Sequence, residues 1–228
     1  MKLGLLGGAF DPIHWGHVGA ALESAYQLNL DEVWLVPGAD PPFKTPAATA
    51  EQRLAMTALA AREGPRLVPS RLELDLPQPS YTVNTLRHLA QARPGDELYF
   101  IVGTDAAASL SAWREPRAIR ALARLVVVER AGWTPAPAAG SAPVAAEGGP
   151  PAPAGGSVPR VEDAGSRADY NARADLALPG GPPDAVVRWP GVAVSSSELR
   201  HRLKTGAPIE YLLPRSVADY IREHGLYR

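Results

Sequence analysis

Eleven residues near the amino terminus, GGAFDPIHWGH at positions 7–17, constrain this chain more than any other stretch. They follow a short apolar run at 2–6, which predicts a buried parallel strand. They lead into an amphipathic stretch at 15–28, which predicts a helix. A strand, a glycine turn and a helix start together bind phosphate well, because the first N–H groups of the helix point at the anion. We therefore expect a phosphate site at this turn.

Gly7 and Gly8 are expected to adopt positive φ and to let a ligand approach the backbone, because neither has a Cβ. His14 and His17 are three residues apart, so they share a face at a helix start and can reach the same phosphates. Two alternatives stay open. The glycines can make a plain tight turn, and the histidine pair can ligate a metal, although no further His or Cys lies nearby to complete such a site.

The run differs from a dinucleotide-binding fingerprint. It contains no Gly-x-Gly-x-x-Gly pattern. The second predicted strand also runs from Val33 to Val36 into Pro37, where that fingerprint places an acidic residue that binds ribose. We therefore expect the phosphate site to serve a different class of nucleotide chemistry.

Charge and composition exclude several classes of protein. The 228 residues carry a formal net charge of −1, so no basic surface for a nucleic-acid polymer is indicated. The absence of cysteine excludes disulfide, thiolate and iron–sulfur chemistry. The amino terminus is a poor signal peptide, and no apolar run approaches the ~20 residues needed to cross a bilayer. We expect a cytoplasmic protein with neither a nucleic-acid nor a membrane partner.

Apolar runs alternate with stretches of helical periodicity along the chain. This pattern predicts an α/β fold, a Rossmann-like doubly wound parallel sheet with helices on both faces and a small C-terminal helical segment. The predicted strands are 2–6, 32–36, 66–68, 97–102, 124–129 and 185–189. The predicted helices are 15–28, 50–62, 83–92, 116–121, 196–204 and 214–224. The alternating segment 71–76 is expected to be an extended edge piece.

We expect one domain over 1–228, with a core at 1–130 and 186–228 and an insertion at about 131–185. Ala, Pro and Gly dominate the insertion between 135 and 156. Such a composition cannot bury enough apolar surface to offset the entropy of ordering it. We expect a flexible surface excursion; a lid or partner-binding element anchored by Trp133 and Tyr170 is the alternative.

Two clusters fall on one side of the predicted site. The loop at 37–44 follows the second strand, so Lys44 is placed to bring a positive charge to a phosphate. Its alternative is a solvated lysine. The run at 80–86, SYTVNTL, places Ser, Thr and Asn at a helix start, which is ordinary capping and is compatible with ligand binding.

Two further clusters follow later strands. Gly103 permits close approach to the backbone, and the Asp105 carboxylate can accept hydrogen bonds from ribose hydroxyls. Trp113 can stack on an aromatic ring or belong to the core.

Ser195 and Glu198 predict a capping box at the start of a short helix. Arg200, about one turn further on, can grip a phosphate with two N–H groups or lie on the surface as a plain arginine.

The His-x-Gly-His run at 14–17 resembles the signature of the nucleotidyltransferase superfamily. With the four later clusters, and in the same order, the chain resembles bacterial nicotinate-nucleotide adenylyltransferases over 1–130 and roughly 186–228. The resemblance implies transfer of the adenylyl group of ATP to nicotinate mononucleotide, which gives deamido-NAD and pyrophosphate. It also implies Mg²⁺ held through the ATP phosphates, with no metal ligands from the protein.

By this resemblance the catalytic residues are His17, Arg200 and His14. The ATP-binding residues are Gly8, Ala9, Phe10, His14, His17, Gly103, Asp105, Ser196 and Arg200. The nicotinate mononucleotide-binding residues are Lys44, Thr85 and Trp113. Three departures stand out: Phe43 replaces the family's usual His, Ser197 replaces its usual Thr, and the insertion is longer than usual.

The implied reaction is a direct in-line displacement without a general base. It requires that two helix starts, near residues 16 and 196, converge on one polyphosphate. Pantetheine-phosphate adenylyltransferase and a catalytically silent nucleotide sensor are the alternative functions. The preference between nicotinate and nicotinamide, and the oligomeric state, a homo-oligomer included, stay open.

Overall fold

The computed structural model describes residues 1–130, 178–192 and 194–228. Its centre is a six-stranded sheet in which every neighbouring pair is parallel, in the order β3-β2-β1-β4-β5-β6. The strands are β1 (Lys2–Gly8), β2 (Glu32–Pro37), β3 (Leu67–Pro69), β4 (Glu97–Gly103), β5 (Arg124–Arg130) and β6 (Ala185–Trp189). The apolar runs became strands because a parallel sheet covered by helices is buried on both faces.

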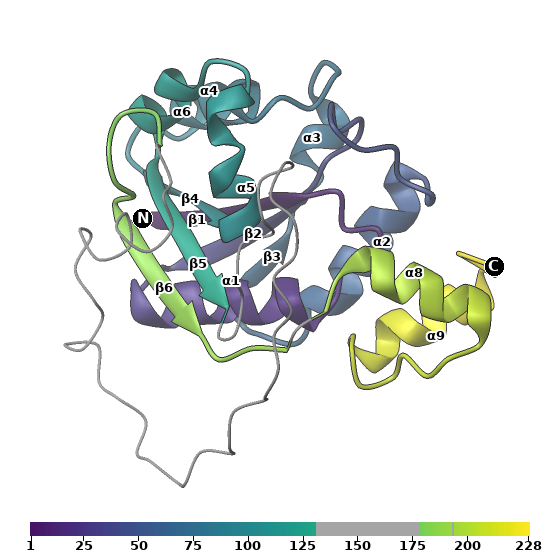
Figure 1. The fold of residues 1–228 in the computed structure, drawn as a ribbon. Helices are drawn as coiled ribbons and strands as arrows, with labels where there is room; N and C mark the ends of the chain where they lie inside the picture. Colours follow the sequence, from purple (N-terminus) through teal and green to yellow (C-terminus); the bar gives the residue numbers. More distant parts are fainter. Residues whose placement is uncertain (131–177, 193) are drawn as a thin grey trace, which may run out of the picture.

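Helices cover both faces of the sheet, which confirms the predicted fold class (Figure 1). One apolar core joins the sheet to α1 (Trp15–Gln27) and α2 (Ala50–Ala61). A second core, on the other face, joins it to α4 (Thr82–Ala92), α5 (Thr104–Ala108) and α6 (Pro116–Leu122). The shorter elements are α3 (Leu72–Asp75) and the 3-10 helix η1 (Leu110–Ala112).

The strand order places the crevice of the fold beside β1. The chain extends from β1 through β2 to β3 in one direction and from β4 through β5 to β6 in the other. Ligands of doubly wound sheets bind beyond the carboxyl ends of the strands where this direction switches. Here those ends are Gly8 on β1 and Gly103 on β4, which are neighbouring strands.

The predicted C-terminal helical segment is confirmed as α8 (Ser196–Thr205) and α9 (Arg215–Glu223). Both helices pack on the same core as α1 and α2, through Leu199, Val217 and Ile221. In Figure 1 they lie beside α2, at the edge of the molecule where the loop after β1 emerges. In the described ranges no helix combines the length and the apolar character that crossing a membrane requires.

The expectation for 71–76 was wrong. Arg71 begins a single helical turn, because its side chain pairs with Asp75 four residues later and its carbonyl accepts the Leu74 N–H. The edge of the sheet is β3, which ends at Pro69. Most of the expected insertion lies outside the described residues, and so do Trp133 and Tyr170.

Candidate active site

The loop after β1 begins differently from the expected glycine turn. Gly7 and Gly8 are extended residues of β1, and Phe10 is the residue with positive φ, at 49°. Phe10 is fully buried, and a Cβ on Gly8 would lie 2.8 Å from its ring. Gly8 is therefore needed for the close approach of Phe10, whereas the cost of the positive φ, ~1 kcal/mol or more, falls on Phe10.

The two histidines form one stacked unit at the start of α1. Their ring centroids are 3.8 Å apart and the planes differ by 25°, as the predicted shared face requires. His14 is buried and caps α1, because its Nδ1 accepts the Gly16 N–H at 3.1 Å. A neutral His14 therefore carries its proton on Nε2. His17 is half-buried, and its ring meets the edge of Phe10 at 4.9 Å.

The expectation that the first-turn N–H groups of α1 are free for an anion was wrong. The Trp15 N–H donates to the carbonyl of Leu212 at 3.1 Å. The Gly16 N–H is taken by His14, and the N–H groups of His17 and Val18 both donate to the His14 carbonyl. An anion near this helix must therefore be met by side chains.

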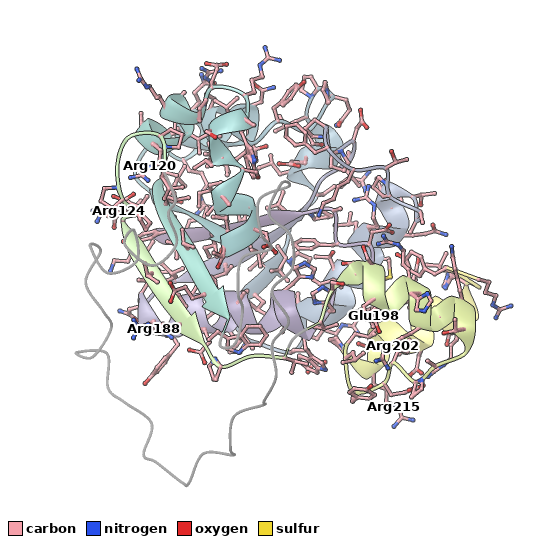
Figure 2. The ribbon with its side chains drawn as sticks, in the orientation of Figure 1. Arg120, Arg124, Arg188, Glu198, Arg202 and Arg215 are labelled. Atoms are coloured by element: carbon pink, nitrogen blue, oxygen red, sulfur yellow. The ribbon has the colours of Figure 1, made fainter. Side chains whose placement is uncertain are left out.

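The start of α8 leaves more room for an anion. Ser195 caps it by accepting the Glu198 N–H at 3.1 Å. Only this half of the predicted capping box forms, because the Glu198 carboxylate pairs with Arg202 four residues later on α8 (Figure 2 labels both residues). The N–H groups of Ser196 and Ser197 have no acceptor inside their helix, and no partner for them is found in the described ranges.

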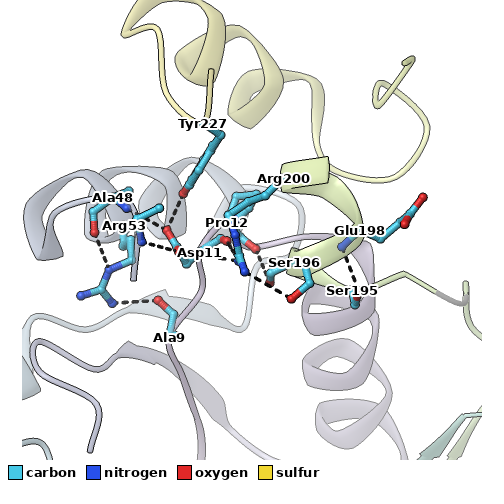
Figure 3. A network of polar contacts seen from close by, with 12 residues as sticks. Ala9, Asp11, Pro12, Ala48, Arg53, Ser195, Ser196, Glu198, Arg200 and Tyr227 are labelled. Atoms are coloured by element: carbon cyan, nitrogen blue, oxygen red, sulfur yellow. Dashed lines mark hydrogen bonds and ion pairs between the residues drawn. The ribbon is translucent and has the colours of Figure 1, made fainter. Parts of the chain in front are cut away.

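The starts of α1 and α8 converge, as the sequence required (Figure 3). The Ser196 hydroxyl donates to the carbonyl of Pro12 at 3.0 Å. Arg200 donates from Nη1 to the Asp11 carbonyl at 2.6 Å and from Nη2 to the Ser197 hydroxyl at 3.2 Å. Its side chain keeps 31% of its surface exposed, so the guanidinium is docked on the loop and still open to a ligand.

Asp11 fixes the loop after β1 at the place where α8 contacts it. Its buried carboxylate accepts the N–H groups of Ala47 and Ala48, at 2.7 and 3.0 Å. It also accepts the Tyr227 hydroxyl at 2.8 Å. Burial, and then the neighbouring Asp11 carboxylate, raise the pKa of Tyr227, so its proton stays in this bond. The penultimate residue of the chain is thereby tied to the loop after β1.

Arg53 is a buried guanidinium that holds two loops together. It is 1% exposed, and it donates to the carbonyls of Ala9 and Gly38 at 2.7 and 2.6 Å. Further bonds reach the carbonyls of Ala39 and Ala48 (Figure 3 draws those to Ala9 and Ala48). Burial lowers the pKa of Arg53, and the charge of Asp11 acts in the opposite direction. The loops after β1 and β2 therefore share one cation.

A hollow of 510 Å³ lies beyond the carboxyl end of β2. It is lined by Asp40, Pro41, Pro42, Phe43, Lys44, Thr45, Pro79 and Tyr81. Phe43 and Lys44 are both exposed at its rim. Lys44 therefore lies at the rim of a hollow beyond the carboxyl end of β2, and its contact with a phosphate stays a prediction.

The capping expectation for 80–86 was wrong. The cap of α4 is Tyr81, whose side chain makes no capping bond. The Ser80 hydroxyl instead accepts the N–H groups of Ala39 and Asp40, at 3.0 and 3.2 Å. Ser80 thus secures the wall of the hollow.

Thr85 and Trp113 lie at the same end of the sheet. Thr85 is buried, and its hydroxyl donates to Glu73 at 2.7 Å. Trp113 is half-buried with its ring edge on Phe100, at 5.9 Å between centroids. Its neighbour Arg114 lies 4.8 Å over the ring of Tyr81, which lines the hollow.

Glu73 is a site residue that the sequence analysis missed. It is 9% exposed, and burial raises its pKa from 4.5 to about 7. Hydrogen bonds from Thr85 and Ser80 work in the opposite direction and are outweighed. The remaining predicted residues lie at the end of β4. Gly103 has open space on its Cβ side, and Asp105 is exposed in the first turn of α5.

Comparison with known proteins identifies the family. A family model described as cytidylyltransferase-like matches residues 5–202. A probable nicotinate-nucleotide adenylyltransferase of Thermus thermophilus is 41% identical over the full length of both chains. Its counterpart in Leifsonia xyli is 35% identical over 100% of this chain and 94% of its own. This chain belongs to the nicotinate-nucleotide adenylyltransferase family.

Solved structures support the same fold. Plasmodium falciparum nicotinic acid mononucleotide adenylyltransferase complexed with APC has a TM-score of 0.68 to this chain, at 17% identity over 99% of this chain and 96% of that one. The same protein complexed with NaAD has a TM-score of 0.67, at 18% identity over 99% and 97%. At this level of identity the likeness concerns the fold alone.

Arg53 and Tyr227 are two further residues of this site that were not predicted, and only Arg53 has a sequence signal. Arg53 stands three residues before Met56 and seven before Ala60, which is the spacing of one buried helix face. Tyr227 lies beside the chain end and has no such periodicity. Only the folded chain brings it to Asp11.

Proposed function

We propose that this protein transfers the adenylyl group of ATP to nicotinate mononucleotide, releasing pyrophosphate and deamido-NAD. The observation that carries the proposal is the convergence of the His14–His17 stack and Arg200 on the loop after β1. A second, acceptor-sized hollow lies beyond the next strand, β2. The two phosphate-bearing substrates would thus enter from adjacent loops, and Arg53 joins those loops beneath them.

The reaction is a direct in-line displacement. A phosphate oxygen of nicotinate mononucleotide forms a bond to the α-phosphorus of ATP, and the bond from that phosphorus to the bridging oxygen breaks. Pyrophosphate leaves with the electron pair. The acceptor phosphate has a second pKa near ~6, so it is already mostly ionised at neutral pH and needs no general base. Catalysis then consists of placing two anions in line and stabilising the charge that moves onto pyrophosphate.

On the ATP side we assign the phosphates to His17, Arg200 and His14. Because the N–H groups at the start of α1 are occupied, positive or donor side chains must supply the contacts. Arg200 is always charged and points across the loop, and the buried His14 holds the ring of the more exposed His17. The rest of the proposed ATP site consists of Gly8, Ala9, Phe10, Gly103, Asp105 and Ser196.

On the acceptor side we assign Lys44 to the acceptor phosphate and Trp113 to the pyridine ring. Lys44 lies at the rim of the hollow, and the loop of Trp113 reaches it through Arg114 and Tyr81. Thr85 belongs to this side through the buried start of α4.

The nucleotide substrate is proposed to be Mg-ATP. In the part of the chain that the structure describes, no three His, Cys, Asp or Glu residues gather as a metal site. We assign the ion to the phosphate oxygens of ATP and to water. When bound, it neutralises charge on the leaving pyrophosphate.

We further propose that residues 1–228 form one cytoplasmic domain with its core at 1–130 and 186–228. The described residues on either side of the expected insertion, β5 and β6, are neighbouring parallel strands of one sheet. A homo-oligomer is compatible with this arrangement.

The test is pyrophosphate release by the purified protein with Mg-ATP and each of three acceptors. We expect release with nicotinate mononucleotide, less with nicotinamide mononucleotide, and none with pantetheine phosphate. The comparison of the two mononucleotides measures the preference that the sequence left open. Binding of Mg-ATP without release would contradict the proposal and indicate a nucleotide sensor.

A further inference from the structure

Glu73 is a buried carboxyl that the proposed reaction does not use. It lies on the single turn α3, which packs against β2 and the start of α4. Its charged neighbours on that turn face away, because Arg71 pairs with Asp75 and with Glu51. A carboxyl that is 9% exposed and lacks such a partner is costly to bury, so its retention needs a reason.

The contacts of Glu73 converge from three segments of the chain. Its Oε1 accepts the Thr85 hydroxyl at 2.7 Å, from α4. Its Oε2 lies against the backbone of Gly38, where a Cβ would come within 3.3 Å of it. The Ser80 hydroxyl opposes the rise in the pKa of Glu73; it donates to Oε1 of Gln78 at 3.0 Å and accepts the N–H groups of Ala39 and Asp40.

These three segments form the wall behind the hollow. The loop that begins at Gly38 continues through Asp40 to Lys44 and lines it, as does Tyr81, next to Ser80. The Ser80 N–H also donates to the Asp40 carbonyl at 3.0 Å. Glu73 therefore lies directly under the loop that carries Lys44.

We propose that Glu73 is a positioning residue for the acceptor nucleotide. It holds Thr85 and the loop from Gly38 to Lys44 in the arrangement that receives nicotinate mononucleotide. It does so through the hydrogen bond from Thr85 and the contact with Gly38, and without touching substrate. The inference rests on the proposed function. The polar contacts that hold Arg200 to its loop do not involve Glu73, so the ATP side should not sense its loss.

The experiment compares steady-state parameters of Glu73→Ala and Glu73→Gln with wild type, using Mg-ATP and nicotinate mononucleotide. Removing the carboxyl takes away the acceptor of the buried Thr85 hydroxyl and should make the loop from Gly38 to Lys44 more mobile. We expect Glu73→Ala to raise the KM for nicotinate mononucleotide about tenfold, equivalent to about 1.4 kcal/mol. The KM for ATP and kcat should stay within about threefold of wild type.

Glu73→Gln keeps an oxygen that accepts the Thr85 hydroxyl, so it should stay within about threefold of wild type in both KM values. The matched control is Glu63→Ala, which removes the carboxyl of an exposed glutamate after α2. It should behave as wild type. Thr85→Val deletes the same hydrogen bond at nearly equal volume, so it should also raise the KM for nicotinate mononucleotide about tenfold. It keeps the role of Glu73 testable if Glu73→Ala fails to fold.

The failures of the two proposals are distinguishable. If wild type releases no pyrophosphate with nicotinate mononucleotide, the function itself is wrong. If wild type is active and both Glu73→Ala and Thr85→Val behave as Glu63→Ala does, only the role of Glu73 is wrong. A Glu73→Ala variant that raises both KM values equally, or Glu73→Gln that does not restore the acceptor KM, also overturns that role.

Discussion

At the scale of single residues, His14 and His17 divide two tasks between stacked rings. The buried His14 caps α1 through Nδ1, whereas the half-buried His17 is not the cap of that helix. Loss of His14 therefore removes a helix cap, worth ~1 kcal/mol, together with any catalytic contact. Loss of His17 separates chemistry from stability.

We predict that His17→Ala lowers kcat by about 10²–10³, the loss typical of deleting one donor to developing charge. Its free energy of unfolding should fall by no more than about 1–2 kcal/mol, since the ring is only half-buried. Pyrophosphate release and urea unfolding measure the two effects. His88→Ala, at an exposed position of α4, is the matched control. Turnover of His17→Ala within a few-fold of wild type would remove His17 from the site.

Glu73 makes a separate prediction about pH and stability. Its pKa rises from 4.5 to about 7 on folding, so between these values the folded chain keeps a proton that the unfolded chain has lost. Stability is therefore unaffected below pH 4.5, falls as pH rises towards 7, and levels off above. The fall amounts to roughly 3 kcal/mol at about 1.4 kcal/mol per unit.

Glu73→Gln should remove this slope, because the amide does not titrate. In urea unfolding at a series of pH values, wild type and variant should be similar near pH 4.5, and the variant should be the more stable above pH 7. Subtracting the two curves cancels every other titrating group. Parallel curves for the two proteins would show that the Glu73 carboxyl ionises normally in the folded state.

At the scale of elements, the packing of α1 on β6 depends on an indole ring held between two glycines. A Cβ on Gly19 would lie 2.2 Å from Cζ2 of Trp189, and one on Gly191 would lie 2.2 Å from Cε3 of the same ring. Glycine at both positions therefore lets the partly buried ring lie directly against the backbone. Gly19 is also interior to α1, where glycine alone disfavours a helix.

We predict that Gly19→Ala destabilises the protein, although the same change in an exposed helix stabilises it by up to ~1 kcal/mol. The steric overlap should cost about 1–3 kcal/mol net, as overpacking does. A thermal or urea unfolding series measures it, with Trp189→Leu and the double variant completing a cycle. The double variant should recover most of the loss caused by Gly19→Ala, and additive effects would show that the ring is not the obstacle.

The elements themselves were largely predictable, because they depend on local patterns. The apolar runs at 97–102 and 124–129 became buried strands, and the amphipathic run at 15–28 became α1, with ends shifted by one or two residues. The segment 71–76 failed because its alternation matches a strand, whereas the Arg71–Asp75 pair stabilises a helical turn.

The loops that form the site were predictable, but the side-chain contacts within it were not. Convergence of the starts of α1 and α8 followed from the motifs, and the Ser196 and Arg200 contacts bear it out. The role of Gly8 did not follow from the motifs. The sequence alone does not distinguish a glycine that must take positive φ from one that leaves space for a neighbouring ring. The burial of Arg53 and Glu73 did not follow either, since their partners come from distant segments.

At the scale of the whole molecule, the C-terminal helices and the sheet are joined at one carboxylate. Asp11 accepts hydrogen bonds from the segment before α2 and from Tyr227 after α9, and its carbonyl receives Arg200 of α8. Asp11 and Tyr227, which are 216 positions apart in the sequence, are thus joined by a hydrogen bond next to the proposed phosphate site. Removing one of these partners of Asp11 should therefore weaken the hydrogen bonds of the others.

We predict that Tyr227→Phe lowers the free energy of unfolding by about 1–2 kcal/mol, the usual loss of a buried hydrogen bond to a charged group. Because the raised pKa of Tyr227 means that only the unfolded chain ionises above pH 10, the advantage of wild type should shrink there. Amide hydrogen exchange tests whether the loss of this bond affects only the C-terminal segment or also the segment before α2. Faster exchange is expected both in α9 and at the amides of Ala47 and Ala48, which Asp11 holds. Exchange that accelerates in α9 alone would mean that Asp11 keeps its loop in place without the tyrosine, and that the two parts of the fold are only adjacent.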